Sequence, residues 1–322
     1  MNFIDIDFTE YLKPTHDDTL RPYLSSTELC RLLERSIAPK DTAALGFGRT
    51  AHEILEHLFN PIAGFIFIAN SQAKTLGLKD PKDALSWDHL DALAGKDPKK
   101  HKVLDDLYLT QPKQANTDAK APLLVVQDAP ENLLKLKQIL ICAIPLIKEF
   151  TAEAEAEDHY TEGSLYIQAS TICDNPTPFD YLSPLHNALK DLGRGIKIRF
   201  DYLQEYSPGE FMLCDWKTTT DVTLDKIEKD IHFYRYRLKM AFYLLALNLA
   251  GHRAELYKLV MFPKLKTPGR VVVYNWSGRN PEDQESLHDY LELMFERYSL
   301  TDLADERRVS LDTQKIISQS LF

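Results

Sequence analysis

Cysteine is scarce in this chain of 322 residues, which contains only four. They form no CxxC pair and no spacing typical of a zinc or iron–sulfur site, and nothing in their distribution indicates a disulfide framework. The four positions are Cys30, Cys142, Cys173 and Cys214. The sequence therefore predicts neither a thiolate metal site nor a disulfide-stabilised secreted fold.

Long hydrophobic runs are also missing. The longest apolar stretches, near residues 65–69 and 139–147, are much shorter than the roughly 18 residues that a membrane-spanning helix requires. Asp5 and Asp7 lie where a secretion signal would carry positive charge. We therefore expect a cytoplasmic protein with no membrane partner.

Basic residues are outnumbered, because 38 Lys and Arg against 48 Asp and Glu give a formal net charge of −10. This balance argues against a generally basic nucleic-acid binder and leaves open a local basic groove. The 44% hydrophobic and 27% charged residues are typical of a globular protein. We expect residues 1–322 to form one elaborated domain.

Several common catalytic motifs are absent. No GxxxxGK[ST] or GxSxG occurs, so P-loop and serine-hydrolase readings have no support. Residues 46–51 fit GxGxxA, but no strand pattern precedes them, which excludes a Rossmann fingerprint. His52 and His57 are five residues apart, about 140° around a helix, and so do not form the HExxH pair of a zinc protease.

The pattern of apolar residues predicts an α/β fold. Residues 20–60 indicate two helices, the first opened by a capping box at Ser25 and Glu28. Residues 61–150 indicate a helical and loop elaboration with a strand at 65–68. Residues 160–300 indicate the core, with strands at 164–169, 196–203, 211–217, 255–262 and 270–276, and helices at 223–249 and 281–298.

The turn at residues 207–209 allows the register of a hairpin to be predicted. If it centres on Pro208, paired residue numbers sum to 416, which places Asp201 opposite Asp215. The same register places Arg199 opposite Lys217. Like charges directly opposite each other are destabilising. Mg²⁺ or Mn²⁺ between the aspartates and a phosphate near the cations would neutralise both pairs, whereas a slipped register or solvent exposure would remove the conflict.

Two further features point to metal-assisted chemistry. Asp215 and Lys217, two apart on a strand, project side by side, an arrangement that suits metal-assisted phosphodiester hydrolysis. His52 lies one residue beside the apolar stripe of its helix, where it is either a hydrogen-bonded histidine at the edge of the core or a ligand. The residues alone do not separate these two roles for His52.

These segments resemble a known family. Residues 195–201 (GIKIRFD) followed by 215–219 (DWKTT) resemble the restriction-endonuclease-like core of PD-(D/E)XK nucleases, a central mixed sheet with flanking helices. Within that superfamily they are most similar to the RecE-like, exonuclease VIII type branch found on prophages. Residues 24–29 and the GxxxH pattern at residues 48–52 agree with this branch, as do Tyr236 and Tyr243. The resemblance extends over about residues 20–300, with an N-terminal helical elaboration.

The resemblance implies a site. It implies Mg²⁺ or Mn²⁺ bound by His52, Asp201, Asp215 and the Trp216 carbonyl, with Lys217 orienting or activating the attacking water. Asp201, Asp215 and Lys217 would then be the catalytic residues. Relatives with an iron–sulfur cluster carry a C-terminal cysteine triplet, and no cysteine follows Cys214, so we expect no cluster. The roles of Glu53 and Glu162 stay undecided at this point.

The expected partner is DNA. Cations near the predicted site could guide a phosphate backbone, or about half of them could be scattered surface charges. The predicted DNA-binding residues are Arg194, Lys197, Arg199, Arg235, Arg237, Lys239, Tyr236 and Tyr243. Lys239 replaces a glutamine usual in the family, so we expect altered DNA handling. The resemblance also implies a homo-oligomer and a single-strand annealing partner protein.

Three functional hypotheses follow from the sequence. The first is a Mg²⁺-dependent exonuclease that acts on double-stranded DNA ends in recombination or phage-type repair. The second is an endonuclease or nickase with the same site. The third is a non-catalytic DNA-binding recombination module on a nuclease fold, for which Lys239 is the sequence support.

Overall fold

The computed structural model of the chain describes residues 23–34, 43–59, 64–78, 86–105, 108–109, 123–152, 159–177, 179–267, 269–297, 299–300 and 302. Its elements form a mixed α/β architecture, as the sequence predicts. In the described part of the chain, no helix is both long and apolar enough to cross a membrane.

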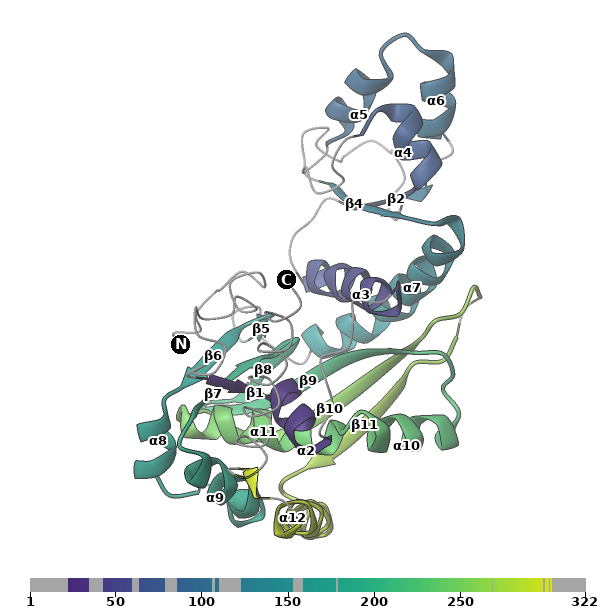
Figure 1. Ribbon diagram of the computed structural model, residues 1–322. Helices are drawn as coiled ribbons and strands as arrows, with labels where there is room; N and C mark the ends of the chain where they lie inside the picture. The colour runs from purple at the N-terminus through teal and green to yellow at the C-terminus, as the bar shows by residue number, and fades with distance from the viewer. Residues whose placement is uncertain are drawn as a thin grey trace, which may run out of the picture.

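A five-stranded mixed sheet forms the centre of the molecule, in the order β11-β10-β9-β8-β5 (Figure 1). β9 and β10 are parallel and the other neighbours are antiparallel, so the chain must cross over between β9 and β10. The crossover is helical. The strands are β5 (His159–Thr161), β8 (Tyr202–Ser207), β9 (Glu210–Thr219), β10 (Arg253–Pro263) and β11 (Val272–Ser277).

A second sheet of three strands extends the first. β7 (Gly195–Arg199) lies in its middle, parallel to β1 (Tyr23–Ser25) and antiparallel to β6 (Ser164–Ile167). β7 leads into β8 through Phe200 and Asp201, so one run of chain passes from one sheet to the other.

Helices cover both faces of the five-stranded sheet. α11 (Tyr236–Leu249) packs on one face, where its apolar side chains join those of β9 and β10 in the main core. α3 (Ala43–Phe59) and α7 (Pro130–Ala152) pack on the other face, in a second apolar cluster with Trp216 (Figure 1). The remaining helices of the main core are α2 (Ser26–Glu34), α8 (Ala169–Asp174), α9 (Ser183–Leu192), α10 (Leu224–Phe233) and α12 (Pro281–Glu296), with a 3-10 turn at Asp180–Leu182.

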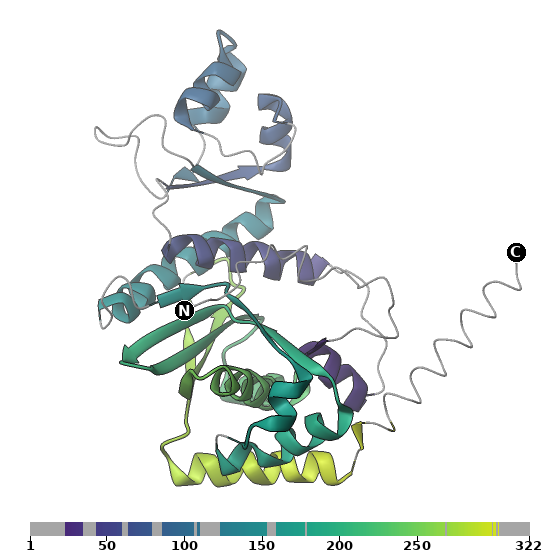
Figure 2. The same cartoon turned by 90° about the vertical axis from the view of Figure 1, so that its left-hand side faces the viewer.

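The described residues between 64 and 128 build a small unit beyond α3 and α7 (Figure 2). It has its own apolar cluster and a three-stranded sheet, which adds two strands to the one predicted near residues 65–68. The strands are β2 (Gly64–Ala69), β3 (Tyr108–Leu109) and β4 (Leu123–Asp128), and the helices are α4 (Asn70–Leu76), α5 (Trp87–Ala94) and α6 (Pro98–Asp105).

The predicted capping box opens α2. The backbone N–H of Ser25 donates to Glu28 Oε2 at 2.9 Å, and the N–H of Glu28 donates to Ser25 Oγ at 3.3 Å. These reciprocal bonds satisfy backbone donors that a helix start leaves unpaired. The local pattern therefore determines this helix start.

The long helix predicted over residues 223–249 is wrong in one respect, because the structure divides it into α10 and α11. Arg235, between them, has φ +55°, a left-handed conformation that costs a non-glycine residue about 1–2 kcal/mol. No glycine or proline lies at this break, and the apolar periodicity continues across it, so the sequence pattern predicts a single helix.

The single strand predicted over residues 196–203 is also wrong. It is interrupted at Phe200 and Asp201, where the backbone pairs with the turn after β5. The N–H of Phe200 donates to the Gly163 carbonyl and the N–H of Glu162 donates to the Asp201 carbonyl, both at 3.1 Å. Arg199 consequently pairs with Ser164 in the second sheet and does not face Lys217.

Glycine is required at position 163 by close contact. A β-carbon there would lie 2.2 Å from Cζ of Phe200, whose ring is fully buried. Glu162 and Asp201 flank this contact along the chain. The packing of Phe200 on Gly163 therefore fixes the positions of the Glu162 and Asp201 backbones, from which both carboxylates project.

We predict that Gly163→Ala lowers the free energy of unfolding by about 1–3 kcal/mol, because the added methyl group overpacks the Phe200 ring. Urea denaturation measures this change. Gly46→Ala is the matched control, since a β-carbon at this exposed helical position meets no atom within 4 Å. Equal stability of the Gly163→Ala variant and the wild type would contradict the proposed contact.

Candidate metal centre

The hairpin register predicted from the sequence is confirmed where β8 and β9 pair. Tyr202 lies opposite Cys214 and Leu203 opposite Leu213, so paired numbers sum to 416. Asp201 immediately precedes this ladder, and its Oδ2 accepts a hydrogen bond of 2.6 Å from the backbone N–H of Trp216. The ladder therefore brings the Asp201 carboxylate beside the segment that contains Asp215 and Lys217.

Asp215 and Lys217 lie on the same face of β9. Lys217 Nζ is 2.7 Å from Asp215 Oδ1 and 3.6 Å from Asp201 Oδ2. It also donates to the Trp216 carbonyl at 3.0 Å. The repulsion expected between the two aspartates is thus offset, in this structure, by an ammonium group that lies between them.

The neighbouring strand adds a residue that sequence reasoning missed. Tyr257 on β10 donates its hydroxyl to Asp215 Oδ2 at 3.2 Å. Because β10 pairs in parallel with β9 after a crossover of more than 30 residues, no short-range pattern links Tyr257 to Asp215. This bond occupies the second oxygen of a carboxylate whose first oxygen contacts Lys217.

His52 reaches the same site from α3. Its Nδ1 lies 3.5 Å from Asp201 Oδ1, and 27% of its side chain is exposed. The apolar stripe of α3 packs against the face of β9 that contains Trp216, which holds His52 at the edge of that packing. The structure therefore places His52 next to Asp201, as the predicted ligand set requires.

Glu162 is the fourth member of the group, and its role was left undecided by the sequence. Ligand atoms of His52, Glu162 and Asp201 all lie within 4.8 Å of one another. Glu162 Oε2 also accepts a 2.8 Å bond from Arg199 Nε. Glu162 adopts φ +50°, a strained conformation that often marks a functional position. Glu53, in contrast, is exposed on α3 and outside this group.

The three carboxylates have different electrostatic environments. Burial would raise the pKa of Asp201, but the charges of Lys217 and His52 outweigh it and hold that pKa far below its usual value. Burial, together with the negative charge of Asp201, raises the pKa of Glu162 to about 7. Burial is also the main cause of the raised pKa of Asp215. The site thus holds more carboxylate groups than its cations readily keep ionised.

The pKa values of the two basic groups of the site, Lys217 and His52, are both raised. Burial disfavours the charged form of Lys217, but Asp215 and Asp201 outweigh that effect and raise its pKa. Burial likewise opposes protonation of His52, and Asp201 again prevails and raises its pKa. Lys217 is therefore a permanent cation at neutral pH and a hydrogen-bond donor.

The chemistry of this donor set fits a hard divalent cation. Three carboxylates and one imidazole offer mostly oxygen ligands, which Mg²⁺ and Mn²⁺ prefer. The raised pKa values of Glu162 and Asp215 reflect negative charge that a divalent cation would offset. The residues present therefore fit the expected metal, and Glu162 joins the predicted ligands by position.

The predicted DNA-binding residues do not form one group. Arg199 is engaged by Glu162, while Arg235 hydrogen-bonds Tyr290 of α12, and Arg237 bonds Ser286 of that helix. Lys239 lies over the Tyr236 ring at 5.3 Å. Tyr236 and Tyr243 lie near the candidate site, because the charges of Lys217 and Asp215 affect the pKa of both tyrosines.

Two further predicted cations lie on or next to β7. Arg194 precedes the strand and is half-buried. Lys197 is half-buried in the second sheet, paired with Ser25 and Tyr166. Lys197 and Arg199 are two residues apart on β7 and therefore share one face of that strand.

Comparison with known proteins finds distant structural similarity without a sequence match. No protein-family model and no curated protein sequence matches the chain. The structure is similar to that of a protein from Eubacterium rectale that is proposed to be an exonuclease, with a TM-score of 0.42 and 9% sequence identity. The match covers 94% of this chain and 88% of that chain.

The environment of Glu162 predicts a pH dependence of stability. Its pKa is about 7 in the folded protein against an ordinary value of 4.5, so the unfolded chain releases the proton first as pH rises. Because of Glu162, the free energy of unfolding of the metal-free protein decreases as pH rises from about 4.5 to 7 and stays lower above that range. The total decrease is about 3 kcal/mol at most. Glu162→Gln should remove this contribution and make the variant relatively more stable at pH 8 than at pH 5.

Urea denaturation in EDTA at pH 5 and pH 8 measures the difference between the variant and the wild type. Glu53→Gln, which changes an exposed carboxylate of α3, is the control and should leave the pH dependence unchanged. A Glu162→Gln variant with the same pH dependence as the wild type would show that Glu162 is not held in this environment.

Proposed function

We propose that the protein is a Mg²⁺-dependent deoxyribonuclease that degrades double-stranded DNA from its ends. One observation carries the proposal: His52, Glu162, Asp201 and Asp215 converge beside Lys217 at a strand interruption in a mixed sheet. Buried carboxylates next to an invariably charged lysine suit hydrolysis of a phosphodiester, whose transition state gains negative charge.

Each residue has a distinct part in the proposed reaction. His52, Glu162, Asp201 and Asp215 would hold the cation, with the Trp216 carbonyl as the further oxygen. A divalent cation supplies positive charge that polarises a phosphoryl oxygen. Lys217 donates hydrogen bonds from an ammonium that two aspartates keep protonated, so it can orient the attacking water or stabilise the phosphoryl oxygens.

The surroundings of Asp215 support the same assignment. Tyr257 fixes one oxygen of Asp215 by a hydrogen bond, and Lys217 contacts the other. Arg199 holds Glu162 from the second sheet. These contacts restrict the orientation of both carboxylates, which is the arrangement that a preorganised metal centre needs.

DNA as the substrate is supported by the motifs that resemble RecE-like nucleases and by the tyrosines and Lys239 near Lys217. On the same grounds we propose activity in recombination or phage-type repair. A homo-oligomer and a single-strand annealing partner protein belong to the same proposal. An endonuclease with this site is the second candidate, because the geometry of the metal centre is compatible with both modes of cutting.

We predict that Asp215→Ala abolishes DNA cleavage, with a rate loss of at least about 10²-fold, because it removes a ligand and the partner of Lys217. The measurement is digestion of an end-labelled linear duplex and a covalently closed circle, with Mg²⁺ or EDTA. Loss of only the linear DNA, dependent on Mg²⁺ and absent in the variant, is the expected result. Asp91→Ala, an exposed aspartate of α5, is the matched control.

The other outcomes of this digestion are equally informative. Cutting of the circle would assign the same chemistry to an endonuclease. Binding without any cutting would favour a non-catalytic module, and full activity of Asp215→Ala would show that the reaction occurs elsewhere.

We further predict that His52→Ala raises the Mg²⁺ concentration needed for half-maximal cleavage by about 10- to 100-fold, because a ligand is lost. High Mg²⁺ or Mn²⁺ should restore part of the rate. His57→Ala, on the same helix and outside the group, should leave the metal dependence unchanged. An unchanged metal dependence of His52→Ala would make His52 a residue of the core edge instead.

A further inference from the structure

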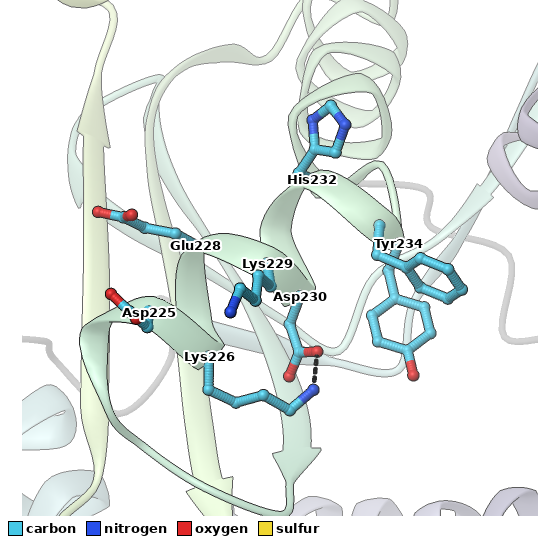
Figure 3. A pocket seen from close by; sticks show the side chains of 8 residues that line it. Asp225, Lys226, Glu228, Lys229, Asp230, His232 and Tyr234 are labelled. Carbon is cyan, nitrogen blue, oxygen red and sulfur yellow. Dashed lines mark hydrogen bonds and ion pairs between the residues drawn. The ribbon is translucent and has the colours of Figure 1, made fainter.

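Exposed aromatic rings gather where α10 meets α11. Phe233 is 72% exposed and Tyr234 is 47% exposed, which is unusual for large aromatic side chains. They border a hollow along α10 (Figure 3). The other residues that line the hollow are Asp225, Lys226, Glu228, Lys229, Asp230 and His232.

The helical backbone is interrupted directly after the two rings. Arg235 adopts its left-handed conformation directly after Tyr234, and its N–H donates to the His232 carbonyl at 3.2 Å. α10 thereby ends at Phe233 and α11 starts anew at Tyr236. The break between the two helices thus comes directly after the two exposed rings.

α10 is fixed to the strand that contributes Asp215 and Lys217. Thr219, two residues after Lys217 on β9, donates its hydroxyl to Asp230 Oδ2 at 3.0 Å, and both residues are buried. Lys226 forms an ion pair with the same carboxylate, drawn in Figure 3. These bonds hold the exposed rings at a defined place relative to the candidate metal centre.

A series of aromatic rings leads from the surface toward that centre. The ring centroids of Phe233 and Tyr234 are 5.0 Å apart, and those of Tyr234 and Tyr236 are 5.7 Å apart. Tyr236 is buried, and the nearby charge of Lys217 affects its hydroxyl. The rings thus form a continuous path from solvent to the neighbourhood of Lys217.

We propose that Phe233 and Tyr234 form a stacking platform for an unpaired nucleobase of the DNA strand whose end enters the site. This inference rests on the proposed function, and names the part of the substrate that the junction would hold. Aromatic faces stack on any base, so such a platform binds a strand without reading its sequence.

The charges beside the rings favour a base in this position over a phosphate. Outside the ion pair of Asp230 with Lys226, the hollow is lined by the two acids Asp225 and Glu228 and by one cation, Lys229, so its net charge is negative and disfavours phosphate. Lys239, also on α11, lies over the Tyr236 ring at 5.3 Å and places a cation next to the series of rings. A nucleic-acid strand can therefore place its base on the rings and its phosphate near Lys239.

The experiment uses DNA with 2-aminopurine, a base whose fluorescence decreases on stacking, as the terminal nucleotide of one strand. Binding is measured with the full-length protein in Ca²⁺ and in EDTA, on a single strand and on a blunt duplex. We expect quenching by the wild type and a 5- to 150-fold weaker affinity, roughly, for Phe233→Ala/Tyr234→Ala, with loss of the quenching.

Two control variants separate stacking from general damage. Leu224→Ala removes a side chain that is 75% exposed at the other end of α10, and should leave both quenching and affinity unchanged. Phe233→Trp keeps an aromatic face and should keep the quenching. Because Phe233 and Tyr234 are exposed, their truncation should leave the unfolding curve in urea unchanged.

The outcomes distinguish this inference from the proposed function. DNA cleavage by the wild type without quenching in Ca²⁺, or equal quenching and affinity in the double variant, would overturn the stacking platform and leave the nuclease assignment intact. Quenching that depends on Phe233 and Tyr234 without any cleavage would support the platform and remove the nuclease assignment. An affinity loss shared by Leu224→Ala would show that the loss is not specific to the two aromatic rings and would also overturn the platform.

Discussion

The contact of Lys217 with the buried Asp215 and the half-buried Asp201 is the interaction on which the candidate site depends. Two carboxylates cannot both remain ionised in a partly buried position without a compensating charge, and the ammonium of Lys217 supplies that charge. Because Asp215 and Lys217 alternate with Trp216 along β9, their alignment on one face also directs Trp216 into the apolar cluster with α3. The same strand thereby orients the charges and positions the helix that contributes His52.

The strand interruption at Phe200 and Asp201 positions the other carboxylates of the candidate metal centre. A continuous strand would have kept Asp201 in the β8–β9 ladder and placed Arg199 opposite Lys217. The interruption instead sends β7 into the second sheet, where Arg199 meets Glu162, and frees the Asp201 carboxylate to bond the backbone of Trp216. Close packing of Phe200 on Gly163 fixes this arrangement. Three carboxylates thus converge because two sheets meet at one point of the chain.

The junction between α10 and α11 follows a similar principle. Arg235 holds a conformation that is unfavourable for its residue type, and a buried hydrogen bond from Thr219 to Asp230 anchors the preceding helix. The cost of the strained residue is compensated by the packing of α11 in the main core. Both irregularities, one in a strand and one in a helix, lie next to the strand that contains Asp215 and Lys217. Irregular backbone therefore gathers around the candidate site, while regular elements support it.

The sequence by itself determined those features that depend on neighbours along the chain. The α2 capping box, the β8–β9 register and the shared face of Asp215 and Lys217 follow from short-range spacing and were predicted correctly. Only the tertiary structure decided the two interruptions, the Tyr257 bond to Asp215 and the place of Glu162 beside His52. Contacts between remote segments impose these features. They are the left-handed conformation of Arg235, the parallel pairing of β10 after a helical crossover, and the packing of the Phe200 ring on Gly163. Hydrophobic periodicity within one segment does not contain that information, because it records which face is buried and not what the face is packed against.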